Sequence, residues 1–153
     1  MKNKGFSLIE VCIGIALVGI MIGIGGPKVR RFIASGKDTK AIATLGALRT
    51  ASELYYSEHG SSPATIKEEG TDIVASLKKL EEYIDPKTFN NIKDGKIEIG
   101  GYMGEEHTVK YGGEMSFTFV DPNTSEKGDG VNIWFAPTEG QEYDMKGNKW
   151  SEY

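Results

Sequence analysis

Hydrophobic and polar positions divide this chain into an apolar stretch, an amphipathic stretch and a region of shorter, alternating patterns. No residue from Val11 to Gly26 is charged, and Glu10 is the only acidic or basic side chain between Phe6 and Pro27. At 1.5 Å per residue, a helix over this span is about 33 Å long, which is enough to cross the hydrocarbon core of a bilayer. The pattern therefore predicts a membrane-spanning helix with one carboxylate near its start.

Helical periodicity continues beyond the apolar span. Small and apolar residues recur at intervals of three and four and form one narrow face: Ala41, Leu45, Leu48, Ser52 and Tyr55. The polar positions assigned to the opposite face are Lys37, Lys40, Thr44 and Glu58. We therefore expect one helix from Phe6 to Tyr56, about 76 Å long, with its first half in the membrane and its second half packed on a domain.

Several residues weaken this long helix. Each interior glycine costs about 1 kcal/mol relative to alanine, and a proline about 3 kcal/mol. The residues concerned are Gly14, Gly19, Gly23, Gly25, Gly26 and Pro27, which predict local bending or melting. Gly19 and Gly23 also have the small-xxx-small spacing that lets two helices approach closely.

Beyond Gly60 the pattern predicts a turn, a short helix and then strands. Thr71 or Asp72 is suited to cap a helix that ends at Asp85-Pro86. Alternation predicts three strands, around Ile97–Ile99, Met115–Phe119 and Val131–Phe135, with turns at Gly100-Gly101, Gly112-Gly113 and Lys146–Asn148. The expected fold class is α+β, with a small antiparallel sheet covering the amphipathic half of the long helix.

The first residues carry a recognisable motif. Met1-Lys-Asn-Lys-Gly5, then Phe6-Ser-Leu-Ile-Glu10 and the apolar run, resembles the prepilin signature of type IV pilins and type II secretion pseudopilins. In plan, the chain most resembles a major pseudopilin. The resemblance implies that a prepilin peptidase cuts between Gly5 and Phe6 and methylates Phe6, that Glu10 sets subunit register during assembly, and that Pro27 kinks the helix.

The resemblance also implies an organisation and a location. Residues 1–5 are the leader, residues 6–27 the transmembrane and assembly half of the helix, and residues 28–153 an extracytoplasmic pilin domain. The protein is expected in the inner (cytoplasmic) membrane as a single-pass protein, with its C-terminal domain outside the cytoplasm, and then in a periplasmic or cell-surface filament. The implied partners are copies of itself in a helical filament, the prepilin peptidase, an inner-membrane assembly platform and membrane lipid.

The physical chemistry of Glu10 agrees with this interpretation. A carboxylate in an apolar span costs up to about 2.5–3.5 kcal/mol, and least near the interface, so a cationic partner is expected. Cleavage before Phe6 would create an ammonium one helical turn away. Glu10 would pair with it in the same chain or in a neighbour offset along a filament. The alternative is an ordinary signal anchor with a stray glutamate near the interface.

Charge and cysteine content narrow the function classes. Lys2 and Lys4 precede the span while Lys28, Arg30 and Arg31 follow it, so the positive-inside rule gives no orientation. Loss of residues 1–5 lowers the basic count from 18 to 16 against 22 acidic residues, and the resulting net charge of −6 argues against nucleic-acid binding. The single cysteine, Cys12, excludes an intrachain disulfide and is interpreted as a small apolar residue.

No catalytic constellation is present in the sequence, so we expect no enzyme. His59 and His107 are the only histidines and lack metal-site spacing. Asp121, Asn123 and Asp129 are calcium candidates, but a solvated turn between two strands is the favoured interpretation. Asn123-Thr124-Ser125 is also a glycosylation sequon.

Three functions remain open at this level. The favoured one is a structural subunit that polymerises through its N-terminal helix into a type IV pilus or a type II secretion pseudopilus. The second is a minor pilin or competence pseudopilin that displays a module for DNA uptake or adhesion. The third is a membrane-anchored extracytoplasmic domain outside any filament, including an enzyme for which no residues are evident.

Overall fold

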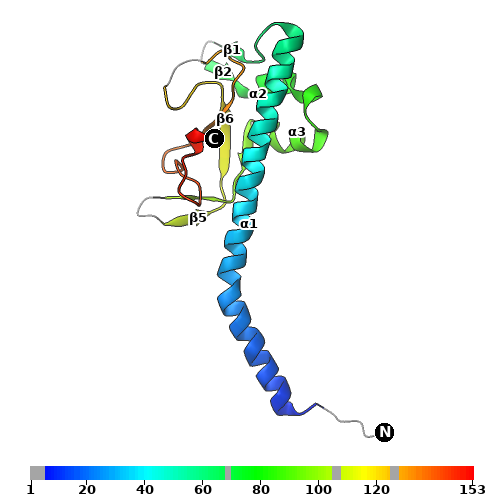
Figure 1. Cartoon of the computed structure of the whole chain (residues 1–153), viewed down its shortest axis with the longest axis vertical. Coiled ribbons are helices and arrows are strands. Elements are labelled where there is room, and N and C mark those ends of the chain that lie inside the picture. The colour runs from blue at the N-terminus through cyan, green and yellow to red at the C-terminus, as the bar shows by residue number, and fades with distance from the viewer. Residues whose placement is uncertain (1–5, 68–69, 105–107, 125–127) are drawn as a thin grey trace, which may run out of the picture. The chain divides into compact units, whose positions relative to one another are not determined.

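The computed structural model describes residues 6–67, 70–104, 108–124 and 128–153. The chain divides into two compact units, one ending at Ile33 and the other covering Ala34–Tyr153, which we call the head. Helices and small antiparallel sheets make up the described residues, which confirms the predicted α+β class. Figure 1 shows the strands beside the C-terminal part of the long helix.

Helix α1 (Leu8–His59) is the predicted long helix, with its start and its end each two to three residues later than expected. It continues as regular helix through every interior glycine and through Pro27. Proline removes one backbone donor, and the hydrogen bonds on either side of it remain. The weak points therefore do not interrupt the helix, and the expected bending or melting stays a prediction.

The end of α1 has a clear physical cause. Gly60 adopts φ +64°, a left-handed conformation that glycine accepts without a Cβ clash. Its N–H donates to the carbonyl of Tyr56 over 2.8 Å. A glycine in this conformation just past the last helical residue is the commonest way to end an α-helix.

In the head, the predicted apolar face of α1 forms one wall of the core. Ala41, Leu45, Leu48 and Ser52 are at most 1% exposed, and Tyr55 packs against the same cluster. The assignment of Thr44 to the solvent face was wrong, because Thr44 is 6% exposed and its hydroxyl donates to the carbonyl of Lys40. Threonine satisfies its hydroxyl within its own helix in this way, so it enters a buried face at little cost.

The core opposite α1 combines aliphatic and aromatic residues from the short helices, the three-stranded sheet and the C-terminal turn. Phe135 stacks on Phe117 at 5.8 Å and meets Trp150 edge to face at 5.3 Å between ring centroids. The buried aliphatic members outside α1 are Leu77, Leu80, Ile84, Ile92, Ile97, Ile99 and Ile133.

Two short helices and a 3-10 turn follow α1. Helix α2 (Ile73–Lys79) is capped by Asp72 as predicted, and the turn η1 (Glu81–Tyr83) follows it. The prediction that this helix continues to Asp85-Pro86 was wrong, because α2 ends at Lys79, and Asp85-Pro86 instead starts helix α3 (Pro86–Ile92). The Asp85 carboxylate accepts the N–H groups of Lys87 and Thr88, and proline is favoured at the first helical position.

The strands form three small antiparallel sheets among the described residues. The three-stranded sheet has the order β3 (Lys96–Glu98), β6 (Glu114–Thr118), β7 (Trp134–Ala136). The two hairpins are β1 (Thr65–Lys67) with β2 (Gly70–Asp72) and β4 (Gly101–Met103) with β5 (Val109–Tyr111). The chain then reaches the 3-10 turn η3 (Trp150–Glu152).

The third predicted strand starts later than expected. Val131 and Ile133 alternate as a strand would, but β7 begins only at Trp134. The Asp129 carboxylate accepts the N–H groups of Val131 and Asn132, at 2.9 and 3.1 Å. A local side-chain turn thus takes the donors that a strand would have used.

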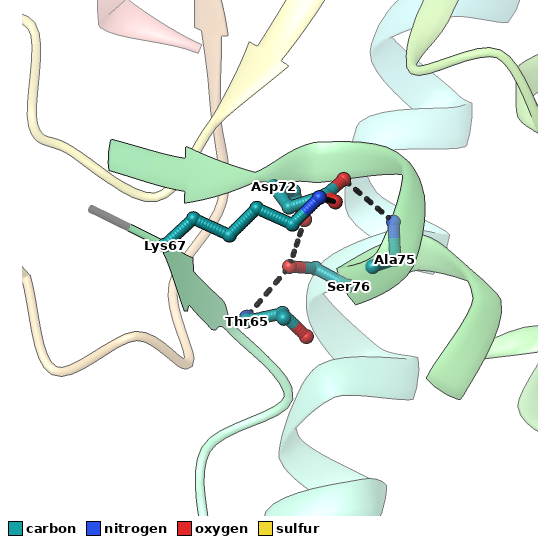
Figure 2. Close-up of polar contacts among 5 residues, drawn as sticks. All are labelled: Thr65, Lys67, Asp72, Ala75 and Ser76. Carbon is teal, nitrogen blue, oxygen red and sulfur yellow. Dashed lines mark hydrogen bonds and ion pairs between the residues drawn. The ribbon is translucent and has the colours of Figure 1, made fainter. Parts of the chain in front are cut away.

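The hairpin β1–β2 is attached to the start of α2 by polar contacts. Figure 2 shows Asp72 accepting the N–H of Ala75, over 3.0 Å, while the ammonium of Lys67 reaches the same carboxylate. The Ser76 hydroxyl accepts the N–H of Thr65 over 2.8 Å and donates to the carbonyl of Asp72. The cap and the ion pair lower the pKa of Asp72, the hydrogen bond from Ala75 most strongly.

Candidate functional site

Glu10 lies in the first turn of α1 and binds the start of its own helix. The N–H of Ser7 donates to Oε2 of Glu10 over 2.9 Å, and the N–H of Glu10 donates to the carbonyl of Ser7 over 3.0 Å. A serine followed three residues later by glutamate is the capping-box pattern, in which the glutamate satisfies the N-cap donor. The carboxylate also lies at the positive end of the helix dipole. The pattern Ser7-x-x-Glu10 was readable in the sequence, but this capping role was missed.

Phe6 is the last residue before this cap and is 88% exposed. Its backbone nitrogen directly precedes the Ser7 nitrogen that Glu10 already binds. An ammonium at Phe6 would therefore lie one residue before the Ser7 N–H that the Glu10 carboxylate accepts. Gly5 and the rest of the predicted leader lie outside the described residues, so cleavage at Gly5–Phe6 stays a prediction.

The first unit of α1 buries none of its large apolar side chains. An 18-residue window of the helix has a mean hydropathy of 2.5 and no buried residue. By length and composition this helix is able to cross a membrane. The most exposed of its large apolar residues after Phe6 are Leu8, Ile15, Met21, Ile22, Ile24 and Phe32.

The glycines of this unit face open space in a single chain. A Cβ added at Gly19 or Gly23 would meet no atom within 4 Å outside the local backbone. No contact among the described residues therefore requires glycine at these two positions, so a close approach of other helices remains their predicted role. Pro27 lies between them and the end of the unit, inside continuous helix.

Comparison with known proteins places these features in a family. Residues 1–26 match the family described as the prokaryotic N-terminal methylation motif. A fimbrial protein of Pseudomonas aeruginosa is 30% identical over 136 residues, covering 84% of this chain and 82% of that protein. The chain belongs to the type IV pilin family. No solved structure matches it.

Two further relatives match smaller parts of this pilin. The type IV major pilin protein PilE of Neisseria gonorrhoeae is 31% identical over 106 residues, or 65% of this chain and 63% of that protein. The type IV major pilin protein PilA of Myxococcus xanthus is 40% identical over 57 residues, which are 37% of this chain and only 26% of that protein. These relatives are pilins and fimbrial proteins, so they give no specific support to the pseudopilin plan expected from the sequence.

Within the head of this pilin, a buried carboxylate on α1 holds the segment between β3 and β4. The sequence analysis missed this residue. Asp38 is 4% exposed, and its Oδ1 accepts the N–H of Gly100 over 2.7 Å. Burial raises the pKa of Asp38, the hydrogen bond from Gly100 opposes that shift, and the nearby Asp144 adds to it. Because the bond joins residues 62 positions apart, helical periodicity alone contains no signal for it.

Gly100 itself is in direct contact with α1. A Cβ at this position would lie 1.8 Å from the carbonyl oxygen of Ala34 and 2.3 Å from its carbonyl carbon. The predicted turn at Gly100-Gly101 is thus a point where two backbones meet, and only glycine fits there. Together with Asp38 it anchors the end of β3 and the start of β4 to the helix.

A second buried carboxylate holds the C-terminal turn. Asp144 is 2% exposed and accepts the N–H groups of Lys146 and Asn148, at 2.7 and 2.8 Å, and the hydroxyl of Tyr153 at 2.7 Å. Burial disfavours its charge, but these hydrogen bonds outweigh that effect and lower the pKa of Asp144 below its ordinary value. The predicted turn at Lys146–Asn148 is confirmed, and a bridge pairs Tyr143 with Lys149 across it.

These two shifts predict how stability depends on pH. A lowered folded-state pKa makes Asp144 stabilising above its unfolded pKa, near 3.9, and this contribution is lost as the pH falls through the lowered value. The raised pKa of Asp38 acts in the opposite direction, since its stabilising effect is lost as the pH rises through that value.

We expect Asp144→Asn to lower the free energy of unfolding by about 1–3 kcal/mol at pH 7. Thermal unfolding of the detergent-solubilised chain measures this loss. Between about pH 5 and pH 2 the variant should lose less stability than the wild type, and equal losses would contradict this role.

The calcium candidates are engaged in turns. Asp121 accepts the N–H of Asn123 over 2.8 Å, and the Asn123 amide donates to the carbonyl of Ser151 over 3.1 Å. Asp129 has the two backbone partners described above. Within the part of the chain that the structure describes, no three His, Cys, Asp or Glu residues are grouped to hold a metal. The backbone hydrogen bonds that Asp121 and Asp129 accept fit the solvated-turn interpretation, and calcium binding remains an untested prediction.

The remaining sequence candidates also receive local roles where they are described. His59 stacks on Tyr55 with ring centroids 4.2 Å apart, at the last turn of α1. His107, and Ser125 of the sequon, lie outside the described residues. Cys12 is exposed on the apolar helix.

Proposed function

We propose that this pilin polymerises through the first unit of α1 into a type IV pilus filament, with further copies of itself as its main partners. The observation that carries the proposal is an 18-residue apolar stretch of α1 with no buried residue, together with a single carboxylate in the first turn of the helix. Each large apolar side chain removed from water contributes about 1.5–3 kcal/mol. The same helices of neighbouring copies would bury these apolar side chains, and no additional surface of the head would be needed for this.

Before assembly, membrane lipid covers the same helix. The proposed location is the inner membrane, with the chain crossing it once and the head outside the cytoplasm. The prepilin peptidase would then cut between Gly5 and Phe6 and methylate Phe6. An inner-membrane assembly platform would transfer the cut subunit from lipid to the growing filament.

The proposed role of Glu10 is to pair with the ammonium that cleavage creates at Phe6. In the uncut chain the carboxylate binds the N–H of Ser7. In the cut chain Phe6 carries an ammonium. In apolar surroundings this full positive charge requires a negative charge close to it, whereas a neutral N–H requires only a hydrogen-bond acceptor. A carboxylate of the neighbouring copy would supply it and would set the axial offset between subunits.

The alternatives have less support. The relatives are described as major pilins and fimbrial proteins, which favours a structural subunit over a minor pilin or a competence pseudopilin. The net charge of −6 after cleavage opposes a DNA-binding role. An anchored domain outside a filament would not require a carboxylate at the start of its span.

The cleavage step gives the first test. Gly5→Leu places a bulky side chain at the junction, so we expect the precursor to stay uncut in the membrane and no filaments to form. Gly14→Leu is the matched control, because it makes the same change inside the apolar run. Intact mass of the membrane-extracted chain distinguishes the two forms. A mature-length Gly5→Leu product would remove the peptidase interpretation.

A further inference from the structure

The two units of this pilin carry opposite charge. After removal of residues 1–5, the first unit has three basic residues and one acidic residue. The head has 13 basic and 21 acidic residues, a net charge of −8. Packing many such heads side by side would bring like charges together, which opposes assembly unless cations lie between them.

The three cations of the first unit lie within residues 28–31 of α1, just beyond the uncharged run. They are Lys28, Arg30 and Arg31, which we call the basic collar. All three are exposed, as are the apolar residues interspersed with them, Val29, Phe32 and Ile33. The nearest acidic residues along the chain are Glu10, which caps the helix start, and Asp38, which is buried against Gly100. Near the collar, α1 therefore presents the positive charges of Lys28 and Arg31 on its exposed surface.

We propose that the basic collar is a docking surface for the acidic head of a second copy in the filament, an inference that rests on the proposed function. Polymerisation through the first unit necessarily carries the collar into the assembly. The heads are then the acidic surfaces available within the filament. Charge of opposite sign attracts a head to the collar, and the exposed Val29, Phe32 and Ile33 add apolar contact area once it has docked.

Salt provides a signature for this contact. At about 0.15 M ionic strength the screening length is about 8 Å, so exposed charge pairs weaken as salt rises. A wild-type collar should therefore hold filaments less well at high salt. If the collar carries negative charge instead, it repels the heads, and salt should partly relieve that repulsion.

The test compares two full-length variants with the same change in net charge. K28E/R31E reverses two collar cations. K87E/K93E reverses two exposed cations on α3 and at its end, where the effects on the helix dipole oppose each other. Cells expressing each variant are grown at low and high NaCl, and filaments are sheared off and quantified against the subunit that remains in the membrane. Intact mass reports cleavage, and thermal unfolding of the solubilised chain reports folding of the head.

We expect K28E/R31E to be cut, folded and inserted like the wild type, with filament yield at low salt reduced roughly tenfold and partly restored at high salt. K87E/K93E should stay within about twofold of the wild type, because it leaves the collar intact. Equal yields of the two variants at low salt would overturn the proposal. So would normal K28E/R31E filaments combined with lost binding to anionic phosphatidylglycerol vesicles, which would assign the collar to lipid headgroups. Absence of wild-type filaments would instead refute the proposed function.

Discussion

Glu10→Leu pilin is expected to be cut and inserted into the membrane normally and yet to form few or no filaments. Leucine keeps the helix and adds apolar surface, so insertion should not suffer. The lost cap to Ser7 costs about 0.5–2 kcal/mol, which is small for a helix of 52 residues. In the filament, however, the Phe6 ammonium loses its partner and the subunits lose their register. Electron microscopy of sheared filaments and immunodetection in the membrane fraction measure the two outcomes.

Two further variants separate the cap from the charge. Glu10→Gln keeps an oxygen that accepts the Ser7 N–H but removes the charge, and we expect it to fail nearly as completely as Glu10→Leu. Glu10→Asp keeps the charge on a shorter side chain and should be intermediate. Normal filaments from Glu10→Gln would show that capping, and not pairing with Phe6, is the role of this residue. Abundant filaments of pure Glu10→Leu protein would remove Glu10 from assembly altogether.

Gly100→Ala is expected to have the largest effect on the head. Its Cβ would lie 1.8 Å from the carbonyl oxygen of Ala34. The atoms that it would meet belong to the backbone of Ala34 and cannot rotate away, so either α1 or the segment around residue 100 has to move. Movement there also stretches the 2.7 Å hydrogen bond from Gly100 to Asp38. We expect a loss of about 3 kcal/mol, or roughly 10 °C in the unfolding midpoint of the detergent-solubilised chain.

Gly46→Ala is the matched control for this prediction. Gly46 lies on the exposed side of the same helix, and a Cβ there would meet no atom within 4 Å. The substitution should stabilise the helix by up to about 1 kcal/mol. A Gly100→Ala chain as stable as the wild type would show that the close contact with Ala34 is not a feature of the protein in solution.

The sequence predicted the long helix and three of the seven described strands, β3, β6 and β7, because these follow local periodicity, whereas it did not predict the hairpins β1–β2 and β4–β5. The face from Ala41 to Tyr55 and the strands around Ile97 and Met115 each repeat within a few residues, so their buried sides are readable without a partner. The motif around Glu10 was equally local. These predictions required no knowledge of which distant residues meet.

The missed features arise where local chemistry competes with a pattern or where distant residues meet. Val131 alternates like a strand, but the Asp129 side chain takes its N–H. Asp38 looks like a solvent-exposed charge until the Gly100 backbone is found beside it. The proposed assembly role of Glu10 also depends on a group distant in sequence, because its proposed partner lies in another copy of the chain.

The central claim is that this pilin is cut before Phe6 and packed into filaments through that end. Mass spectrometry of subunits from purified, sheared filaments tests it most directly. We predict a chain that begins at Phe6 and carries one added methyl group on its terminal nitrogen. Filaments built from chains that still begin at Met1, or membranes that contain the cut chain without any filament, would contradict the account.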